Sequence, residues 1–208
     1  MKLFLSSTTI SDGLIAPFIA LVGKELKDIS FALIENAADP YGENAGFVLE
    51  NRATLQLLGM RLELIDLNQY QNKTNELKER LSNFDVIWFG GGNTYYLRWI
   101  MKVTGFDTIV KELLGTGIIY GGGSAGAVVT GNTLRHFDLV DDPKSSPEIM
   151  YLGLGLTDLV IIPHWGTEKI QEKLHEIQSL FTNDNIETIQ ISDNQAVIVN
   201  DERWTVLP

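Results

Sequence analysis

The sequence predicts an α/β fold: a single-domain, doubly wound, mostly parallel sheet with helices on both faces and a C-terminal β-hairpin. Three observations lead to this prediction. Short runs of β-branched and aromatic residues alternate with longer segments of helical period. Glycine-rich turns follow several of the short runs. The 208 residues are 44% apolar, which is enough for one substantial core, so we expect residues 1–208 to form one domain.

Strands are expected where short apolar runs are bounded by turn residues. Six such runs are Lys2–Ser6, Ile29–Ile34, Arg61–Asp66, Val86–Phe89, Ile118–Tyr120 and Val160–Ile162. Near the end of the chain, Gln195–Val199 and Arg203–Val206 flank the turn residues 200–202. This pattern predicts the C-terminal hairpin.

Helices are expected between the strands, where apolar residues recur at steps of three and four. The predicted helices are Leu14–Leu26, Ala45–Leu58, Thr74–Leu81, Thr94–Lys102, Phe106–Leu114 and Thr167–Phe181. Gly59 is expected to follow the end of the second helix in a left-handed conformation. The last helix should bury one stripe, which consists of Ile170, Leu174, Ile177 and Phe181. The loop 138–150, rich in proline and acidic residues, is expected to be mobile.

The composition excludes several classes of function. A net charge of −11 without a basic cluster argues against nucleic acid and anionic membrane surfaces as partners. The absence of cysteine excludes disulfides, thiolate metal sites and thiol catalysis. The N-terminal apolar run is too short for a signal sequence, and nothing elsewhere approaches a membrane span, so we expect a cytoplasmic protein. Composition leaves open whether the chain forms a homodimer.

The most informative stretch is Ile118–Ala127, where an apolar run meets a helix-compatible one. Within it, Gly122, Ser124 and Gly126 satisfy G-x-S-x-G, the nucleophile elbow. In that motif the serine occupies a tight strand-to-helix turn with its hydroxyl exposed above the sheet edge. Ser124 is therefore the candidate nucleophile, and the next backbone N–H, that of Ala125, is free to bind an oxyanion.

The same stretch also fits a second motif. Gly121, Gly123 and Gly126 satisfy G-x-G-x-x-G, so a nucleotide- or phosphate-binding turn stays open as an alternative. Against it, the match falls on about the fifth strand instead of the first, and no P-loop lysine follows. A third interpretation is that the chain has this fold but no catalytic activity.

Three histidines could act as the base that a serine nucleophile needs. His175 lies within a predicted helix, on its solvated flank. His136 lies in a segment that is poorly placed for the site. His164 follows an apolar strand and Pro163, so it should lie at the same sheet edge as Ser124. His164 is therefore the candidate base.

The base needs an acidic partner for its other ring nitrogen. Asp138 lies between the serine and His164 in chain order, as in many α/β enzymes, and is favoured. Asp193 follows another short strand and is the alternative relay acid. An aspartate in such a position more often serves as a solvated loop carboxylate or as the cap of a helix or turn, and this alternative applies to both residues.

The first glycine run of the chain, Gly90–Gly92, follows the strand Val86–Phe89. Its backbone N–H groups could join that of Ala125 in an oxyanion hole. Asn93 or Thr94 is expected to cap the helix that follows. Asn93 is also a candidate contact for substrate, because ligands bind at the carboxyl ends of the strands in such sheets.

Three segments together resemble the peptidase S51 family, which includes the aspartyl dipeptidases (peptidase E) and the cyanophycinases. They are Phe-Gly-Gly-Gly-Asn-Thr at 89–94, Gly-Gly-Ser-Ala-Gly-Ala at 122–127 and Ile-Pro-His at 162–164. The resemblance implies a doubly wound fold related to class I glutamine amidotransferases. It also implies hydrolysis of peptide bonds after aspartate by a serine nucleophile, without a metal or cofactor.

Carried over by position, the resemblance implies a role for each matched residue. Ser124 would be the nucleophile and His164 the base. The backbone N–H groups of Gly91, Gly92 and Ala125 would form the oxyanion hole.

The sequence departs from the family at two places. The family's acidic residue would fall at Leu139, next to Asp138, with Asp141 and Asp142 just beyond. The family's arginine for substrate aspartate has no counterpart after His164, which leaves cations elsewhere to bind an acidic side chain. These are Lys169, Arg135 and Arg98. We therefore expect a serine peptidase of the dipeptidase or exopeptidase kind that acts on short peptides, without carrying over the preference for aspartate.

Overall fold

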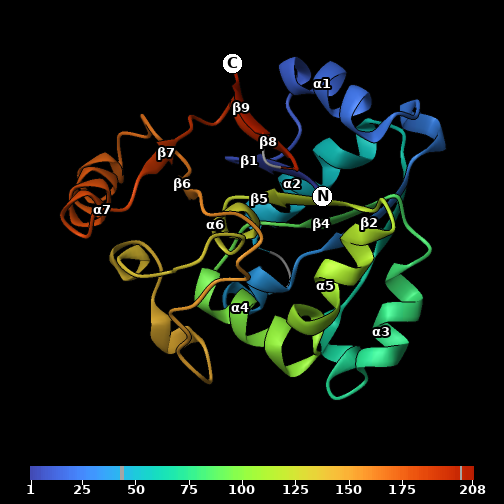
Figure 1. Cartoon of the computed structure of the whole chain (residues 1–208), viewed down its shortest axis with the longest axis horizontal. Coiled ribbons are helices and arrows are strands. Elements are labelled where there is room, and N and C mark those ends of the chain that lie inside the picture. The colour runs from blue at the N-terminus through green and yellow to red at the C-terminus, as the bar shows by residue number, and fades with distance from the viewer. Residues whose placement is uncertain (43–44, 202) are drawn as a thin grey trace.

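The structure, a computed structural model, describes residues 1–42, 45–201 and 203–208. Within these residues the main sheet has seven strands in the order β3-β2-β4-β5-β1-β8-β9 (Figure 1). The strands are β1 (Lys2–Ser6), β2 (Ser30–Ile34), β3 (Arg61–Leu64), β4 (Val86–Phe89), β5 (Ile119–Gly123), β8 (Ala196–Asn200) and β9 (Arg203–Leu207). The first five strands of that order pair in parallel. The predicted mostly parallel sheet is confirmed.

Helices cover both faces of this sheet, as predicted (Figure 1). One face carries α1 (Asp12–Val22) and α2 (Gly46–Leu57), and the other carries α3 (Thr74–Leu81), α4 (Thr94–Val103) and α5 (Phe106–Gly115). Because successive side chains of a strand point to opposite faces, each strand contributes to both cores. In β4, Trp88 packs on the side of α1 and α2, whereas Phe89 packs against Phe106 of α5.

The C-terminal hairpin is also present. β8 runs antiparallel to β1, and β9 runs antiparallel to β8. Of the predicted turn, Glu202 lies outside the described residues. The hairpin covers the edge that β1 would otherwise expose, so β1 and β5 lie inside the sheet.

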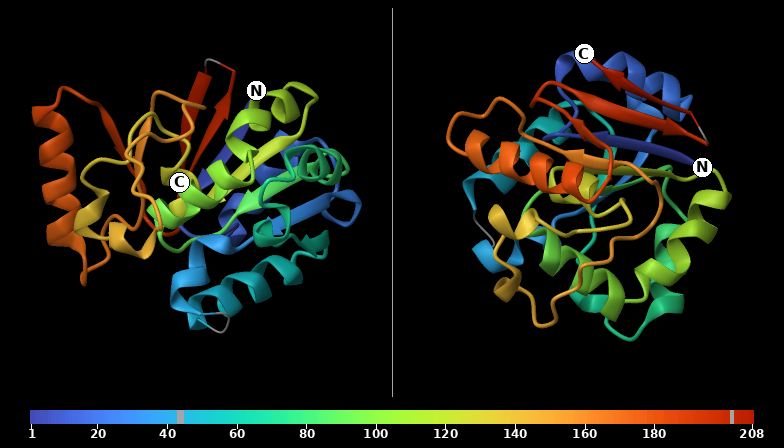
Figure 2. Two further views of the ribbon diagram at one scale, coloured as in Figure 1. Left: turned by 90° about the horizontal axis from the view of Figure 1, so that it is seen from below. Right: turned by 60° about the vertical axis from the view of Figure 1, so that its left-hand side comes forward.

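One predicted strand lies elsewhere. β6 (Val160–Ile162) does not join the main sheet but pairs in parallel with β7 (Thr188–Gln190) (Figure 2). The reason is that β8 already occupies the place beside β1. The small sheet packs instead with α7 (Gln171–Asn183) and with Tyr95 of α4 in a separate apolar cluster.

Several boundaries differ from the sequence expectation. Gly23, in a left-handed conformation with φ 77°, ends α1 four residues early, whereas Gly59 follows α2 with φ 76° as predicted. The helix expected from Thr167 begins only at Gln171, although Leu174, Ile177 and Phe181 of its predicted stripe are buried.

The loop 138–150, expected to be mobile, is tied to α4. The backbone N–H of Thr94 donates to Asp141 Oδ2 at 2.9 Å, and Asn93 Nδ2 donates to the carbonyl oxygen of Asp142 at 2.9 Å. Lys102 and Glu148 form an ion pair farther along. These contacts hold the loop along α4, from Thr94 at the amino end of the helix to Lys102 in its last turn.

Among the described helices, none combines the length and the apolar character needed to cross a lipid bilayer.

Candidate active site

Ser124 lies in a strained turn between β5 and the short helix α6 (Ala125–Val128). Its backbone has φ 52° and ψ −113°, a conformation that costs about 1–3 kcal/mol for a residue with a side chain. Three backbone hydrogen bonds hold the turn. The N–H of Ser124 donates to Ser6 O at 3.1 Å, and its carbonyl oxygen accepts from Ala127 and Val128 at 2.8 and 2.9 Å.

The two glycines of the G-x-S-x-G motif make this turn sterically possible. A Cβ atom at Gly122 would lie 2.3 Å from the carbonyl oxygen of Gly126. A Cβ atom at Gly126 would lie 2.1 Å from the carbonyl oxygen of Phe89. Neither position has room for a side chain, so the motif allows β5, β4 and α6 to approach closely around Ser124.

His164 meets Ser124 across the gap between the two sheets. Its Nε2 lies 2.8 Å from Ser124 Oγ, within hydrogen-bond distance. The histidine follows β6 and Pro163 and has φ 61°, and the next residue, Trp165, donates its N–H to Ile191 O at 3.0 Å. The end of β6 therefore turns toward β5 even though the two strands belong to different sheets.

The carboxylate on the other side of the imidazole belongs to Asp193. Its Oδ1 lies 2.7 Å from His164 Nδ1 and accepts a hydrogen bond from Ser7 Oγ, also at 2.7 Å. Thr8 Oγ1 donates to the Asp193 carbonyl oxygen at 3.1 Å. Asp193, the alternative relay acid of the sequence analysis, thus completes a continuous path of hydrogen bonds to Ser124 Oγ.

Asp138, which chain order favoured, lies away from this path. It is exposed on a short 3-10 turn, Phe137–Leu139, and among the described residues it forms no hydrogen bond with His164. The physical reason is that His164 reaches the site from the small sheet. Its Nδ1 therefore faces the ends of β1 and β7, where Ser7 and Asp193 lie.

Ser7 was missed by the sequence reasoning. Its side chain is fully buried, accepts the backbone N–H of His164 at 2.7 Å and donates to Asp193. It therefore fixes the histidine and the carboxylate relative to each other. The available signal was the hydroxyl-rich run 7–9, which directly follows the first predicted strand.

The first glycine run lies beside the serine hydroxyl. A Cβ atom at Gly91 would lie 3.2 Å from Ser124 Cβ and 3.7 Å from its Oγ. In the described part of the chain, the backbone N–H groups of Gly91, Gly92 and Ala125 have no hydrogen-bond acceptor. Unpaired N–H groups next to a nucleophile are suited to stabilise an oxyanion.

A second carboxylate lies close to the site. Burial raises the pKa of Asp141, although its hydrogen bonds with Thr94 and the nearby charge of His164 oppose the shift. Burial together with Asp141 also raises the pKa of Tyr41. Both groups lie near the amino end of α4, next to the first glycine run.

Of the residues considered for substrate binding, two are engaged elsewhere and two are exposed. Asn93 is fully buried, with its Oδ1 accepting from the N–H of Tyr96, so it caps α4 and is not available to substrate. Arg98 pairs with Asp107 at 3.0 Å. Arg135 and Lys169 are exposed, and neither contacts Ser124, His164 or Asp193 in the described residues.

The other two histidines have contacts of their own. His136 Nε2 lies 2.9 Å from Asp184 Oδ2, and its ring packs edge-on against Phe181. His175 is exposed on α7, as expected, and packs against Trp165.

The geometry disfavours a phosphate-binding turn at G-x-G-x-x-G. Gly121 and Gly123 belong to β5, and a Cβ atom there would lie 2.3 Å from the Trp88 ring and 1.8 Å from Thr8 O. Their backbone is packed and not open to a ligand. Across the described residues, no group of three or more His, Asp or Glu side chains is arranged to hold a metal ion.

Comparison with known proteins identifies relatives of the chain. Residues 13–207 match the model of peptidase family S51. An uncharacterized peptidase of Listeria innocua is 29% identical over 157 residues, which cover 75% of this chain and 74% of the relative. An uncharacterized peptidase of Listeria monocytogenes is 27% identical over 154 residues, 74% of each chain.

Two solved structures share the fold. A Listeria monocytogenes protein assigned provisionally to peptidase E superposes with a TM-score of 0.82 at 24% identity, covering 99% of this chain and 96% of that one. A peptidase from an acI-B1 Actinobacterium gives a TM-score of 0.65 at 18% identity, covering 99% and 86%. At these identities the likeness establishes the architecture. Because the family model spans nearly the whole sequence, the chain belongs to peptidase family S51.

Proposed function

We propose that the chain is a serine peptidase that cleaves short peptides, with Ser124 as nucleophile, His164 as general base and Asp193 as the residue that orients the base. One observation carries the proposal. Asp193 Oδ1, the two ring nitrogens of His164 and Ser124 Oγ form an unbroken path with separations of 2.7 and 2.8 Å. Such a path lets a hydroxyl lose its proton as it attacks.

In the first half of the reaction, Ser124 Oγ attacks the peptide carbonyl carbon while His164 Nε2 takes the hydroxyl proton. The carbonyl oxygen becomes an oxyanion, which the N–H groups of Gly91, Gly92 and Ala125 would stabilise. The C–N bond then breaks as the imidazolium gives its proton to the leaving amine. An ester of Ser124 remains.

In the second half, a water molecule attacks this ester while His164 accepts one of the water protons. The ester C–O bond breaks, the proton returns to Ser124 Oγ and the carboxylic acid product leaves. Throughout, Asp193 holds the Nδ1–H tautomer and stabilises the imidazolium. Ser7 positions both partners through its two hydrogen bonds.

The dipeptidase or exopeptidase character of this proposal rests on the resemblance of the three motif segments to the family. A preference for aspartate is not part of it, because Arg98 is paired with Asp107, and Arg135 and Lys169 contact none of Ser124, His164 and Asp193 in the described residues. Recognition of an acidic side chain without an available cation would be costly.

The test is a screen of unblocked and N-blocked dipeptides and tripeptides against the wild type and Ser124→Ala. We expect Ser124→Ala to lower kcat/KM by a factor on the order of 10⁶ while the circular dichroism spectrum and melting temperature stay unchanged. Ser82→Ala, an exposed position at the end of α3, is the matched control. Cleavage by Ser124→Ala at the wild-type rate would refute the mechanism.

A further inference from the structure

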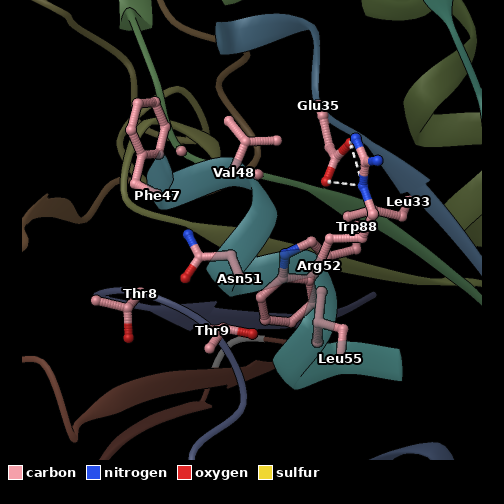
Figure 3. A pocket seen from close by; sticks show the side chains of 12 residues that line it. Thr8, Thr9, Leu33, Glu35, Phe47, Val48, Asn51, Arg52, Leu55 and Trp88 are labelled. Atoms are coloured by element: carbon pink, nitrogen blue, oxygen red, sulfur yellow. Dashed lines mark hydrogen bonds and ion pairs between the residues drawn. The ribbon is translucent and has the colours of Figure 1, made fainter. Parts of the chain in front are cut away.

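Apolar side chains are exposed at several places on the surface, mostly on helices and in loops. Phe47, which lines the pocket shown in Figure 3, packs edge-on against Tyr41, so part of each ring is covered. Trp204 and Val206 lie instead on β9, the outermost strand at one side of the main sheet (Figure 1). They are 47% and 36% exposed. Apolar surface thus coincides here with an open edge of the sheet, where backbone groups are unpaired as well.

The turn before β9 decides which backbone groups of the strand bond to β8. Asn200 and Arg203 lie opposite each other, as the last residue of β8 and the first of β9. Residues that flank a two-residue turn exchange hydrogen bonds, and along an antiparallel pair such residues alternate with ones that do not. Thr205 and Leu207 therefore also bond to β8.

Trp204 and Val206 occupy the alternate positions, so their N–H and C=O groups point away from β8. In the described part of the chain, neither N–H group donates to an acceptor outside the sheet. Both residues therefore offer a donor and an acceptor along the outer edge of β9, next to their exposed side chains. An edge of this kind is a template for a further strand.

The opposite edge strand, β3, is protected against such pairing. Its exposed side chains include Arg61 and Glu63, and Glu63 forms an ion pair with Arg80. Charged side chains on an edge strand discourage pairing with another chain. In β9 the one charged residue is Arg203, which lies beside the turn, and the strand contains no proline. The two edges of the sheet therefore differ, and only β9 lacks charges along its length.

The sequence of β9 is complementary to itself. Two copies placed antiparallel, with Thr205 opposite the partner's Thr205, pair all five residues of the strand. Trp204 then lies opposite the partner's Val206, and each outward N–H group meets an outward C=O group of the other copy. Aromatic–β-branched pairs and Thr–Thr pairs are favourable across strands. Arg203 of each copy lies at an opposite end of the shared ladder, so like charges do not meet.

We propose that the chain forms a symmetric homodimer in which β9 pairs with β9 of a second copy about a two-fold axis at Thr205. The pairing joins two seven-stranded sheets into one. The occupant is a second copy because one register satisfies the backbone of the edge and matches its side chains at the same time. Five-residue strands bury an area at the low end of specific interfaces, so we expect dissociation in the micromolar range.

Sedimentation velocity over a concentration series tests the assembly. We expect a shift from monomer to dimer as the concentration rises, without larger species, because a two-fold contact closes on itself. A wild type that stays monomeric at the highest soluble concentration would overturn the proposal, and this includes the case in which β9 instead binds an extended peptide of another protein. Oligomers larger than a dimer would overturn it too.

The role of the apolar side chains is tested by Trp204→Ser. Loss of the aromatic ring at the centre of the contact should raise the Kd of the dimer about tenfold or more. Leu57→Ser is the matched control, because Leu57 is an 88% exposed apolar residue at the end of α2. Its Kd should equal that of the wild type. A dimer that survives Trp204→Ser unchanged would place the interface elsewhere.

The register is tested by placing charges on the two-fold axis. Thr205→Lys and Thr205→Glu each bring like charges directly opposite, so either variant alone should raise Kd about fivefold or more. An equimolar mixture of the two, with one of them fluorescently labelled, should form a mixed dimer at least as tight as the wild type, because opposite charges then face each other.

The same pair of substitutions at Thr54, an exposed position of α2, is the matched control and should change neither Kd nor the behaviour of the mixture. Circular dichroism and the melting temperature show whether each variant is folded. Recovery of the dimer in the mixture requires both variants to be folded and Thr205 to face its own counterpart. Folded Thr205 variants that each dimerise like the wild type, or that fail to form the mixed dimer, would refute the pairing.

Discussion

Two runs of three glycines lie next to Ser124, and the structure shows that glycine is needed in each run for a different physical reason. In the second run, Gly121–Gly123, a Cβ atom at Gly123 would lie 1.8 Å from Thr8 O. In the first run, Gly90–Gly92, a Cβ atom at Gly91 would lie 3.2 Å from Ser124 Cβ and 3.7 Å from Ser124 Oγ. The second run is closed by the Trp88 ring and by the backbone of Gly126 and Thr8, whereas Gly91 borders the space around a reactive hydroxyl.

The difference shows that the same composition can serve packing or chemistry. Glycine in β5 makes room for the Trp88 ring and for the carbonyl oxygens of Thr8 and Gly126 around the strand that presents Ser124. Glycine at 91 instead leaves an N–H group and free volume where substrate would lie. Gly92 resembles the glycines of the second run. Its φ is 147°, and a Cβ atom there would lie 2.2 Å from the carbonyl oxygen of Ala37, so the position excludes a side chain.

Apart from the loss expected for Ser124→Ala, the largest expected effect tests whether Ser124, presented by the second run, depends on Asp193 for its chemistry. Asp193→Asn should lower kcat/KM for a cleaved dipeptide about 10⁴-fold, because it loses the negative charge that stabilises the imidazolium. Asp138→Asn is the control and should stay within about threefold of the wild type. A large loss in Asp138→Asn with none in Asp193→Asn would return the relay role to Asp138.

The packing role of the second run is tested by Gly123→Ala. The new methyl group would overlap Thr8 O, so the free energy of unfolding should fall by about 3 kcal/mol or more. Gly13→Ala in α1, where a Cβ atom would meet nothing within 4 Å, should instead raise stability by about 0.5–1 kcal/mol. Urea unfolding measures both, and an unaffected Gly123→Ala would remove the distinction between the runs.

The chemical role of the first run is tested by Gly91→Ala. The methyl group would crowd the Ser124 hydroxyl, so kcat/KM should fall about 10- to 100-fold. The unfolding free energy should change by less than about 1 kcal/mol, because no backbone atom blocks the position as closely as at Gly123. If Gly91→Ala instead loses stability while its folded fraction keeps full specific activity, Gly91 serves packing, as Gly123 does.

The smallest expected effect concerns the support of the histidine. Ser7→Ala removes a hydrogen bond to Asp193 and one from the His164 N–H, so kcat/KM should fall about tenfold. The neighbouring Ser6→Ala loses only a long contact with Gly122 O at 3.4 Å, and it serves as the matched control for stability and activity. Equal activities of the two variants would show that Ser7 is only structural.

Strands and helices were predictable where the local sequence pattern decides. Val86–Phe89 and Thr74–Leu81 have the predicted bounds because short apolar runs and helical periods depend on neighbouring residues alone. Ile118–Tyr120 was too short a prediction, since β5 continues to Gly123. Glycine normally weakens a strand, so the glycines did not indicate one. Here they are required because the Trp88 ring and Thr8 O, both remote in sequence, leave no room for a side chain.

The candidate site was predictable in part for the same reason. Ser124 and His164 each follow an apolar run and a turn signal, so their place at strand ends could be inferred. The choice between Asp138 and Asp193 could not, because it depends on which loop the His164 ring faces. Asn93 was recognisable as a cap, but its complete burial, which excludes contact with substrate, depends on the loop at Asp142.

By itself, the sequence determined the class of fold, the elbow at Ser124 and the imidazole that accompanies it, because these follow from patterns within single segments. Only the tertiary structure decided that β6 leaves the main sheet and that Asp193 and Ser7 meet His164. It also decided that Glu35 pairs with Arg52. These outcomes depend on contacts between segments far apart in the chain, whose geometry no local pattern specifies.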